Sequence, residues 1–308
     1  MKLNLFQKTA IITVITTVGV ILMGSLVRAS GAGLGCPDWP RCFGMWIPPM
    51  TAAELPPQYD ATLFNPLHTW LEYINRLTGA LAGIMITITF FASFHYRKKD
   101  PVITIFSGLA LVMVLFQAWL GGLVVRSGLS AGLITVHMVI AMTLLAVLLY
   151  ATFRAFNERS GFYLQVDIKK KLLWVSGLLF LLTMAQLVLG TQVREAVDVA
   201  KNVLELPRAE WLGTVDGLYE IHRSFSWLLV LATAVLLYMN RKYPVPRRLN
   251  TLSLAIAGLI FLQILIGIGL EKFDMAGVFQ VLHLVGVSIL ICTILIYYFS
   301  VWFSNRRI

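Results

Sequence analysis

Charged residues are scarce in this chain of 308 residues: Asp, Glu, Lys and Arg make up 13% of it, and hydrophobic residues 58%. This balance excludes a soluble globular domain, in which about a quarter of the residues are charged. The apolar runs are also spaced so closely that no room is left for a separate soluble domain. The composition therefore predicts an integral membrane protein.

Eight runs of predominantly apolar residues are long enough to cross a bilayer, which takes about 20 residues in a helix. The first run leads into Arg28 and Ser30 rather than into a small-residue cleavage site, so we interpret it as a retained helix and not as a signal peptide. The sequence thus predicts an all-α fold of eight transmembrane helices. The expected spans are residues 9–29, 71–94, 102–125, 132–153, 170–192, 218–239, 250–270 and 276–302.

Acidic residues are also few, 15 against 25 basic ones, but the net charge of +10 follows membrane topology rather than a surface for nucleic acid. Most basic residues lie at the two termini and after alternate spans, which the positive-inside rule places in the cytoplasm. Residues 30–70 and 193–217 should then form a cap on the outer side. We expect a multi-pass protein of the bacterial inner membrane with both termini cytoplasmic. The inner basic set is Lys2, Lys8, Arg97, Lys98, Lys99, Arg154, Arg159, Lys169, Lys170, Lys171, Arg241, Lys242, Arg247, Arg248, Arg306 and Arg307.

Only three cysteines are present. Cys36 and Cys42 lie in the first outer segment, on the oxidising side of the membrane, where five intervening residues can close a small disulfide loop. The compartment favours a disulfide over two free thiols. Cys292 lies in the middle of the last span, where a thiol behaves as a small buried hydrophobic group.

The chain repeats itself at a nearly constant offset. Asn75-Arg76 matches His222-Arg223 at an offset of 147 residues, and three helices keep this register to within one residue. Four spans per half is an even number, so the halves run in the same direction, as parallel repeats do. We expect two four-helix bundles, residues 1–155 and 169–308. The further matches at an offset of 146 are Gln117, Gly121, Arg126 and His137 with Gln263, Gly267, Lys272 and His283, and at 166 Gly24 and Arg28 with Gly190 and Arg194.

Four of the five histidines, His68, His137, His222 and His283, lie near the starts of even-numbered spans. Ionisable side chains inside a span are costly unless they are paired or functional. A structural zinc site usually has four nitrogen or sulfur ligands, and no thiolate lies near His222 or His283. Haem needs one or two axial histidines in an apolar slot. The sequence therefore predicts a haem between His222 and His283.

Six basic residues within the predicted spans or at their outer ends run against the positive-inside trend. Such residues either reach lipid headgroups or pair with an anion, and the two propionates of a haem would serve. They are Arg28, Arg126, Arg194 and Lys272 at the outer ends of odd-numbered spans, and Arg76 and Arg223 after the ligand-equivalent positions.

Several motifs together resemble the haem A synthases of the cytochrome oxidase assembly family, over essentially the whole chain. They begin with Leu-Val-Arg at 26–28 and Gly-Ala-Gly-Leu-Gly-Cys-Pro-Asp-Trp-Pro at 31–40. They continue with Glu-Tyr-Ile-Asn-Arg at 72–76, Gly-Thr-Gln-Val-Arg-Glu at 190–195 and Ile-His-Arg at 221–223.

The resemblance implies that haem O is the substrate and that one of its ring methyl groups is oxidised to the formyl group of haem A. It implies haem b in the second half, between His222 and His283, and a catalytic carboxylate at Glu72. Haem O synthase, membrane lipid, an electron donor and a second copy of the chain are candidate partners, and nucleic acid is not. The resemblance also implies His137 as a ligand of the substrate haem and the outer pair Cys36 and Cys42. Together with the cations argued above, the expected residues are Arg194, Arg223 and Lys272 at haem b, and His137, Asn75, His68, Arg28, Arg76 and Arg126 at the substrate haem.

One departure from the family is that Asn75 stands where the first iron ligand of the first half would be. Either His68 replaces it, or the substrate iron has His137 as its one protein ligand and an open face, which we favour. His68 could otherwise pair with Glu72 or flank the start of its helix. The alternative function is a non-catalytic haem b protein for electron transfer or haem handling. Glu72 favours the enzyme, because an electron carrier has little use for a carboxylate within a span.

Overall fold

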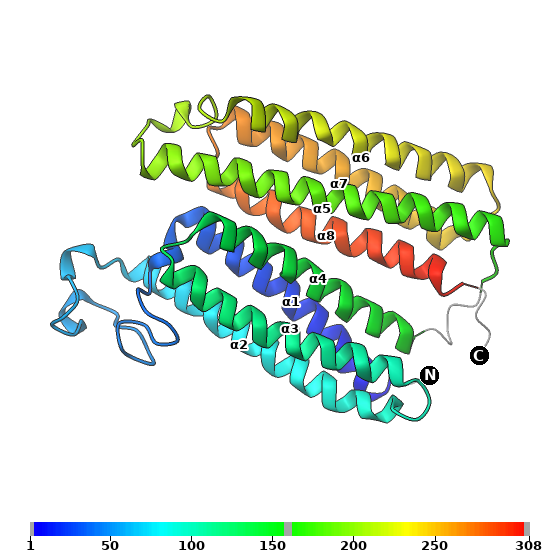
Figure 1. Cartoon of the computed structure of the whole chain (residues 1–308), viewed down its shortest axis with the longest axis horizontal. Helices are drawn as coiled ribbons and strands as arrows, with labels where there is room; N and C mark the ends of the chain where they lie inside the picture. The colour runs from blue at the N-terminus through cyan, green and yellow to red at the C-terminus, as the bar shows by residue number, and fades with distance from the viewer. Residues whose placement is uncertain (1–2, 157–161, 305–308) are drawn as a thin grey trace.

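A computed structural model describes residues 3–156 and 162–304, which form eight long helices, with a long segment, residues 31–65, between the first two (Figure 1). Each of the eight is long and apolar enough to cross a membrane, which confirms the predicted all-α membrane fold. The long helices are α1 (Leu5–Ser30), α2 (Pro66–Ala92), α3 (Pro101–Arg126), α4 (Ala131–Ala155), α5 (Val166–Asn202), α6 (Asp216–Lys242), α7 (Arg247–Lys272) and α8 (Gly277–Trp302). The 3₁₀ turns are η1 (Ala32–Leu34), η2 (Ala52–Glu54), η3 (Ala61–Leu63), η4 (Ser93–Tyr96) and η6 (Arg208–Glu210).

Local sequence sets several of the helix ends. Asn4 and Gln7 form a capping box at the start of α1, and Gly31 ends that helix with a φ of 78°, which a residue without Cβ adopts freely. Pro66 and Pro101 begin α2 and α3, where the missing N–H costs nothing. The spans are therefore fixed by caps as well as by apolar length.

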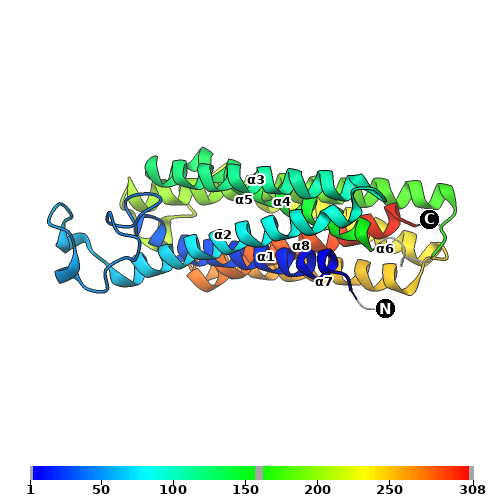
Figure 2. The ribbon, with the colours of Figure 1, turned by 90° about the horizontal axis from the view of Figure 1, so that it is seen from below.

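The helices lie in two groups, α1–α4 and α5–α8, side by side along their length (Figures 1 and 2). Within each group every helix contacts its neighbours along the chain, and the groups meet where α8 contacts α1 and α4 and where α4 contacts α5. An apolar seam at this junction contains Met142, Leu145, Leu187, Ile291 and Leu295. Each group therefore has internal packing, and α8 belongs to both the second group and the junction.

Two helices extend further than the hydropathy predicts. α2 begins at Pro66 rather than near 71, because Asn65 accepts a hydrogen bond from the His68 N–H and caps the helix. α5 runs to Asn202, so the first part of the 193–217 segment is helix rather than an irregular cap. Val193 and Val197 explain the extension, since they are buried in a cluster with Val215 and Met275.

The start of α1 and the end of α8 lie at one end of the molecule, and the 31–65 and 203–215 segments lie at the other (Figure 1). This agrees with an even number of spans. Four members of the inner basic set, Lys2, Arg159, Arg306 and Arg307, lie outside the described residues.

Candidate functional site

The second helix group contains a cavity of about 630 Å³ that reaches the 203–215 end of the molecule, where Leu212 lines it. This volume falls within the range of about 300–1,000 Å³ of cofactor and small-molecule pockets. Side chains from α5, α6, α7 and α8 line it, and α1 and α4 of the first group complete the wall. The lining is mostly apolar, with charged groups near the helix ends, as an amphiphilic ligand requires.

His222 and His283 project into this cavity from α6 and α8. Each lies six residues after the first residue of its helix. The two ring centres are 6.4 Å apart and the ring planes cross at 72°. Each Nδ1 atom is buried without a hydrogen-bond partner among the described residues. The structure thus brings together the two histidines that were predicted as a pair.

The spacing of the two rings fits a shared metal. An iron bonded to one nitrogen of each ring at about 2 Å keeps the ring centres about 6–6.5 Å apart. The rings are too far apart to hydrogen bond directly, because ring nitrogens must approach to about 3 Å. The donor set, the apolar walls and the spacing therefore fit a haem iron held by two histidines.

Cations gather at the mouth of the cavity, as the propionates of a haem would require. Arg194 Nη1 lies 2.8 Å from Asp198 Oδ1, and its Nε is buried with no hydrogen bond to any described residue. Arg223 is exposed and lies 4.0 Å from Glu271, which also accepts a hydrogen bond from the Tyr219 hydroxyl. Lys272 lines the same mouth from the end of α7.

The structure places Arg28 between the two helix groups. It was expected at the substrate haem of the first half, but it lines the cavity of the second half and forms an ion pair with Asp198 of α5. The reason is that the outer end of α1 packs into the junction between the helix groups. Arg126, the last residue of α3, stays exposed on the first group.

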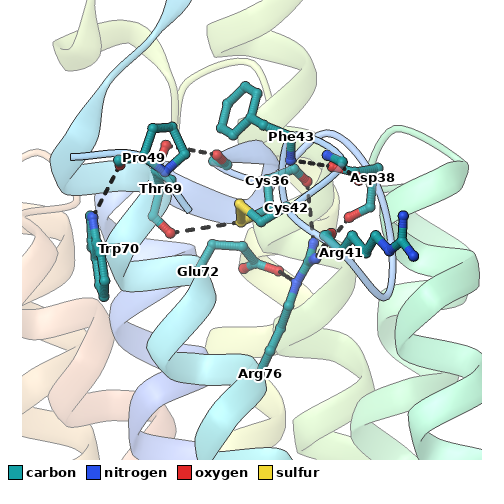
Figure 3. The surroundings of a disulfide bond; sticks show 12 residues. Cys36, Asp38, Arg41, Cys42, Phe43, Pro49, Thr69, Trp70, Glu72 and Arg76 are labelled. Atoms are coloured by element: carbon teal, nitrogen blue, oxygen red, sulfur yellow. Dashed lines mark hydrogen bonds and ion pairs between the residues drawn. A yellow bond between two sulfur atoms is a disulfide. The ribbon is translucent and has the colours of Figure 1, made fainter. Parts of the chain in front are cut away.

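In the first group, Glu72 is only 5% exposed and accepts a hydrogen bond of 3.0 Å from Arg76 Nε, one turn along α2 (Figure 3). The rest of the Arg76 guanidinium points away from the helix, toward the loop closed by the Cys36–Cys42 disulfide. There Nη1 donates to the carbonyls of Asp38 at 2.7 Å and Arg41 at 2.8 Å, and Nη2 to that of Cys36 at 3.2 Å. Glu72 and its cation therefore form one unit with the outer loop.

His137 and Asn75 face glycines of neighbouring helices. A Cβ added to Gly121 of α3 would lie 3.6 Å from His137 Cε1, and one added to Gly24 of α1 would lie 3.8 Å from Asn75 Oδ1. His222 meets Gly190 of α5 in the same way, at 3.1 Å. Asn75 therefore lies opposite a glycine of a neighbouring helix, as His137 and His222 do.

His68 lies apart from this place, in the first turn of α2. Its backbone carbonyl lies against Gly35, where any Cβ would overlap it. Glu72 has Arg76 as its ion-pair partner, and no hydrogen bond among the described residues joins it to the His68 side chain. The structure thus brings Glu72, Asn75 and Arg76 together on α2 and places His68 with the outer loop.

Sequence reasoning did not foresee that two glutamines hold histidine-bearing helices, although it had matched Gln117 within the repeat. Gln117 donates to the backbone carbonyl of His137 at 2.9 Å, and Gln186 donates to that of His222 at 2.8 Å. Each glutamine lies four residues before the glycine that faces the same histidine, so one helix face carries both. The spacing Gln-x3-Gly, visible three times in the sequence, was the signal that could have identified them.

The predicted disulfide between Cys36 and Cys42 is confirmed, with the two Cα atoms 4.8 Å apart. Cys292 is a free thiol on α8 and is partly buried.

Comparison with known proteins places this arrangement in a family. A profile of the family described as cytochrome oxidase assembly protein matches residues 7–295. The chain belongs to this family. A protein named Heme A synthase from Shewanella oneidensis is 26% identical over 325 residues, covering 96% of each chain. A Heme A synthase from Halalkalibacterium halodurans is 26% identical over 92% of each chain, and one from Alkalihalophilus pseudofirmus is 31% identical over 49% of this chain and 48% of its own length.

Membership of the cytochrome oxidase assembly family confirms the resemblance that the motifs indicated. The match spans both helix groups, so the cavity of the second half and the Glu72 unit of the first both lie inside it.

Proposed function

We propose that this chain is a haem A synthase, a membrane oxidoreductase that converts a ring methyl group of haem O into the formyl group of haem A for cytochrome oxidase assembly. Full-length similarity to proteins named Heme A synthase supports the activity. One observation favours an enzyme rather than an electron-transfer protein. Glu72 is buried within a span and is held in place by Arg76. A buried ionisable group in a membrane is expensive and marks a functional site.

The proposed cofactor is haem b, held by His222 and His283, with Arg194, Arg223 and Lys272 near its propionates. When bound, it would accept and pass on single electrons. The protein's own part is to exclude water with apolar walls, to fix both rings, and to offset the propionate charges. The ring spacing of 6.4 Å and the orphaned Nδ1 atoms support this assignment.

The proposed substrate site lies in the first half, with His137 as the protein ligand of the haem O iron and Glu72 as the acid–base or cation-stabilising group. Asn75 then faces iron with a carboxamide, which is a poor iron ligand. We propose that this leaves one face of the iron without a protein ligand, which suits oxidation of the bound haem because a bis-histidine iron offers no open position. His68 and Arg126 stay outside this core, and Arg28 serves the second half.

Replacing Asn75 by histidine should add the missing ligand. We expect Asn75→His, loaded with haem O, to gain a second low-spin haem signal in electron paramagnetic resonance, and Asn75→Ala to keep the wild-type spectrum. A wild-type protein in which the haem O iron is already low-spin would contradict the open face.

The proposed activity is tested by expressing the chain in cells that make haem O but no haem A, and by analysing extracted haems by chromatography and mass spectrometry. We expect haem A to accumulate, because the chain would supply the one missing oxidation. If haem O remains the only modified haem while haem b copurifies with the protein, the second candidate holds. That candidate is a haem b electron-transfer or haem-handling protein, and the loss of an iron ligand at Asn75 favours it.

We also propose that residues 1–155 and 169–308 are related by a parallel repeat, supported by the contact of Asn75 with Gly24 in the first group and of His222 with Gly190 in the second. The proposed location is the bacterial inner membrane with both termini cytoplasmic, supported by the basic residues at the end opposite the disulfide. The predicted partners stay predictions: haem O synthase, a second copy of the chain, membrane lipid and an electron donor.

A further inference from the structure

The outer loop of residues 35–44 is fastened to the first helix group at several points. The Thr69 hydroxyl donates to the Gly35 carbonyl at 2.9 Å, and the close approach of Gly35 to the backbone of α2 leaves no room for a side chain. Trp39 packs on Gly122 of α3, where an added Cβ would lie 3.0 Å from the indole. The loop is therefore a fixed part of the wall above Glu72.

Asp38 and the disulfide hold the internal shape of this loop. The Asp38 carboxylate accepts hydrogen bonds from the backbone N–H groups of Phe43 at 2.6 Å and Gly44 at 2.9 Å (Figure 3). The Cys36–Cys42 bond closes the same turn. With the loop held in this shape, the backbone carbonyls of Cys36, Asp38 and Arg41 all accept hydrogen bonds from the Arg76 guanidinium.

Arg76 has few donors left for any other partner. A guanidinium carries five N–H groups, and four hydrogen bonds join this one to Glu72 and to the three loop carbonyls. Its side chain is 13% exposed. Arg76 is thus engaged inside the protein, whereas Arg223, its counterpart in the second half, is 67% exposed at the cavity mouth.

We propose that Arg76 is a positioning residue, which fixes the Glu72 carboxylate by anchoring it to the backbone of the disulfide-closed loop. The proposal rests on the proposed function, because it takes Glu72 as the catalytic group. Arg76 does not bind a propionate of the substrate. The loop carbonyls fix the position of the Arg76 guanidinium, and the guanidinium in turn fixes the position of the Glu72 carboxylate.

The first test compares steady-state conversion of haem O by Arg76→Gln, Arg76→Lys and wild type. We expect Arg76→Gln to lower kcat about a hundredfold at nearly unchanged KM, as misplacement of a reacting group by about 1 Å does. Arg76→Lys keeps the charge but not the fork of donors, so it should recover part of the loss. In a Glu72→Gln background, Arg76→Gln should change kcat less than about twofold, because it acts through Glu72. A raised KM with normal kcat would show that Arg76 binds substrate and would overturn the proposal.

The second test needs no turnover, so it separates failure of this proposal from failure of the proposed function. Labelling of Glu72 by dicyclohexylcarbodiimide is followed by peptide mass spectrometry on the purified full chain. We expect labelling about tenfold faster in Arg76→Gln, the lower end of what a neighbouring cation does to the proton affinity of a carboxyl. The double variant Cys36→Ser, Cys42→Ser should shift labelling in the same direction.

Arg41→Gln is the matched control. It removes another arginine of the same loop, but its side chain is exposed over Trp46 and only its backbone carbonyl meets Arg76. Its labelling and kcat should equal those of wild type. Equal labelling in Arg76→Gln and wild type, with the haem b spectrum intact in both, would overturn the positioning role.

Discussion

If haem b is held as proposed, replacing either His222 or His283 by alanine should abolish the low-spin haem b spectrum of the purified protein. Both rings face one cavity with their centres 6.4 Å apart, so neither can be replaced by another described histidine without moving a helix. Loss of one axial ligand leaves a five-coordinate, high-spin iron or no haem at all. Optical and electron paramagnetic resonance spectra, with haem quantified per chain, measure the effect.

The same variants should also be less stable toward heat. A ligand present at a hundred times its dissociation constant stabilises the folded state by about 2.7 kcal/mol, which a protein without haem loses. His95→Ala is the control, because His95 is exposed at the opposite end of the molecule. If both cavity variants keep a full low-spin signal, the haem of the second half is held by other residues.

Replacing Glu72 by glutamine should reduce haem A formation by a factor of about 10²–10⁴, the contribution usual for a general acid or base. Glutamine keeps the size of the side chain and can still accept a hydrogen bond from Arg76, so the fold and the haem b spectrum should not change. The measurement is the ratio of haem A to haem O in membranes that contain equal amounts of protein.

Glu54→Gln is the matched control for Glu72. Hydrogen bonds from the Met50 N–H and the Thr51 hydroxyl lower the pKa of Glu54, so this carboxylate is charged, but it lies exposed in the outer segment. Its removal should leave conversion unchanged. Normal haem A formation by Glu72→Gln would end the case for a catalytic carboxylate at this position.

Much of the fold could be predicted because the bilayer imposes strong rules on sequence. Apolar length predicted all eight spans, and compartment and spacing predicted the disulfide. Helix ends were harder. The extension of α5 depends on Val193 and Val197 meeting Val215 and Met275, which come from other parts of the chain.

The sequence predicted those parts of the candidate site that depend on rare side chains. It could not predict the contacts that backbone groups make. His222 and His283 stand out because histidine is rare in spans. The partners of Arg76 could not be predicted, since three of them are carbonyl groups that every residue carries. The partner of Arg28 could not be predicted either, because Asp198 lies on α5, far from Arg28 in the sequence.

The wall that α1 and α4 give to the cavity of the second half bears on the order of assembly. Arg28, Thr135 and Met138 line the cavity but precede α5–α8 in the chain. They are therefore synthesised before the residues that form the rest of the cavity wall. Thr135 then joins Thr191 and Gln192 of α5 through hydrogen bonds of 3.0 and 3.2 Å. A second half produced alone would lack this side, and haem could be enclosed only after the last helix, which carries His283, had docked.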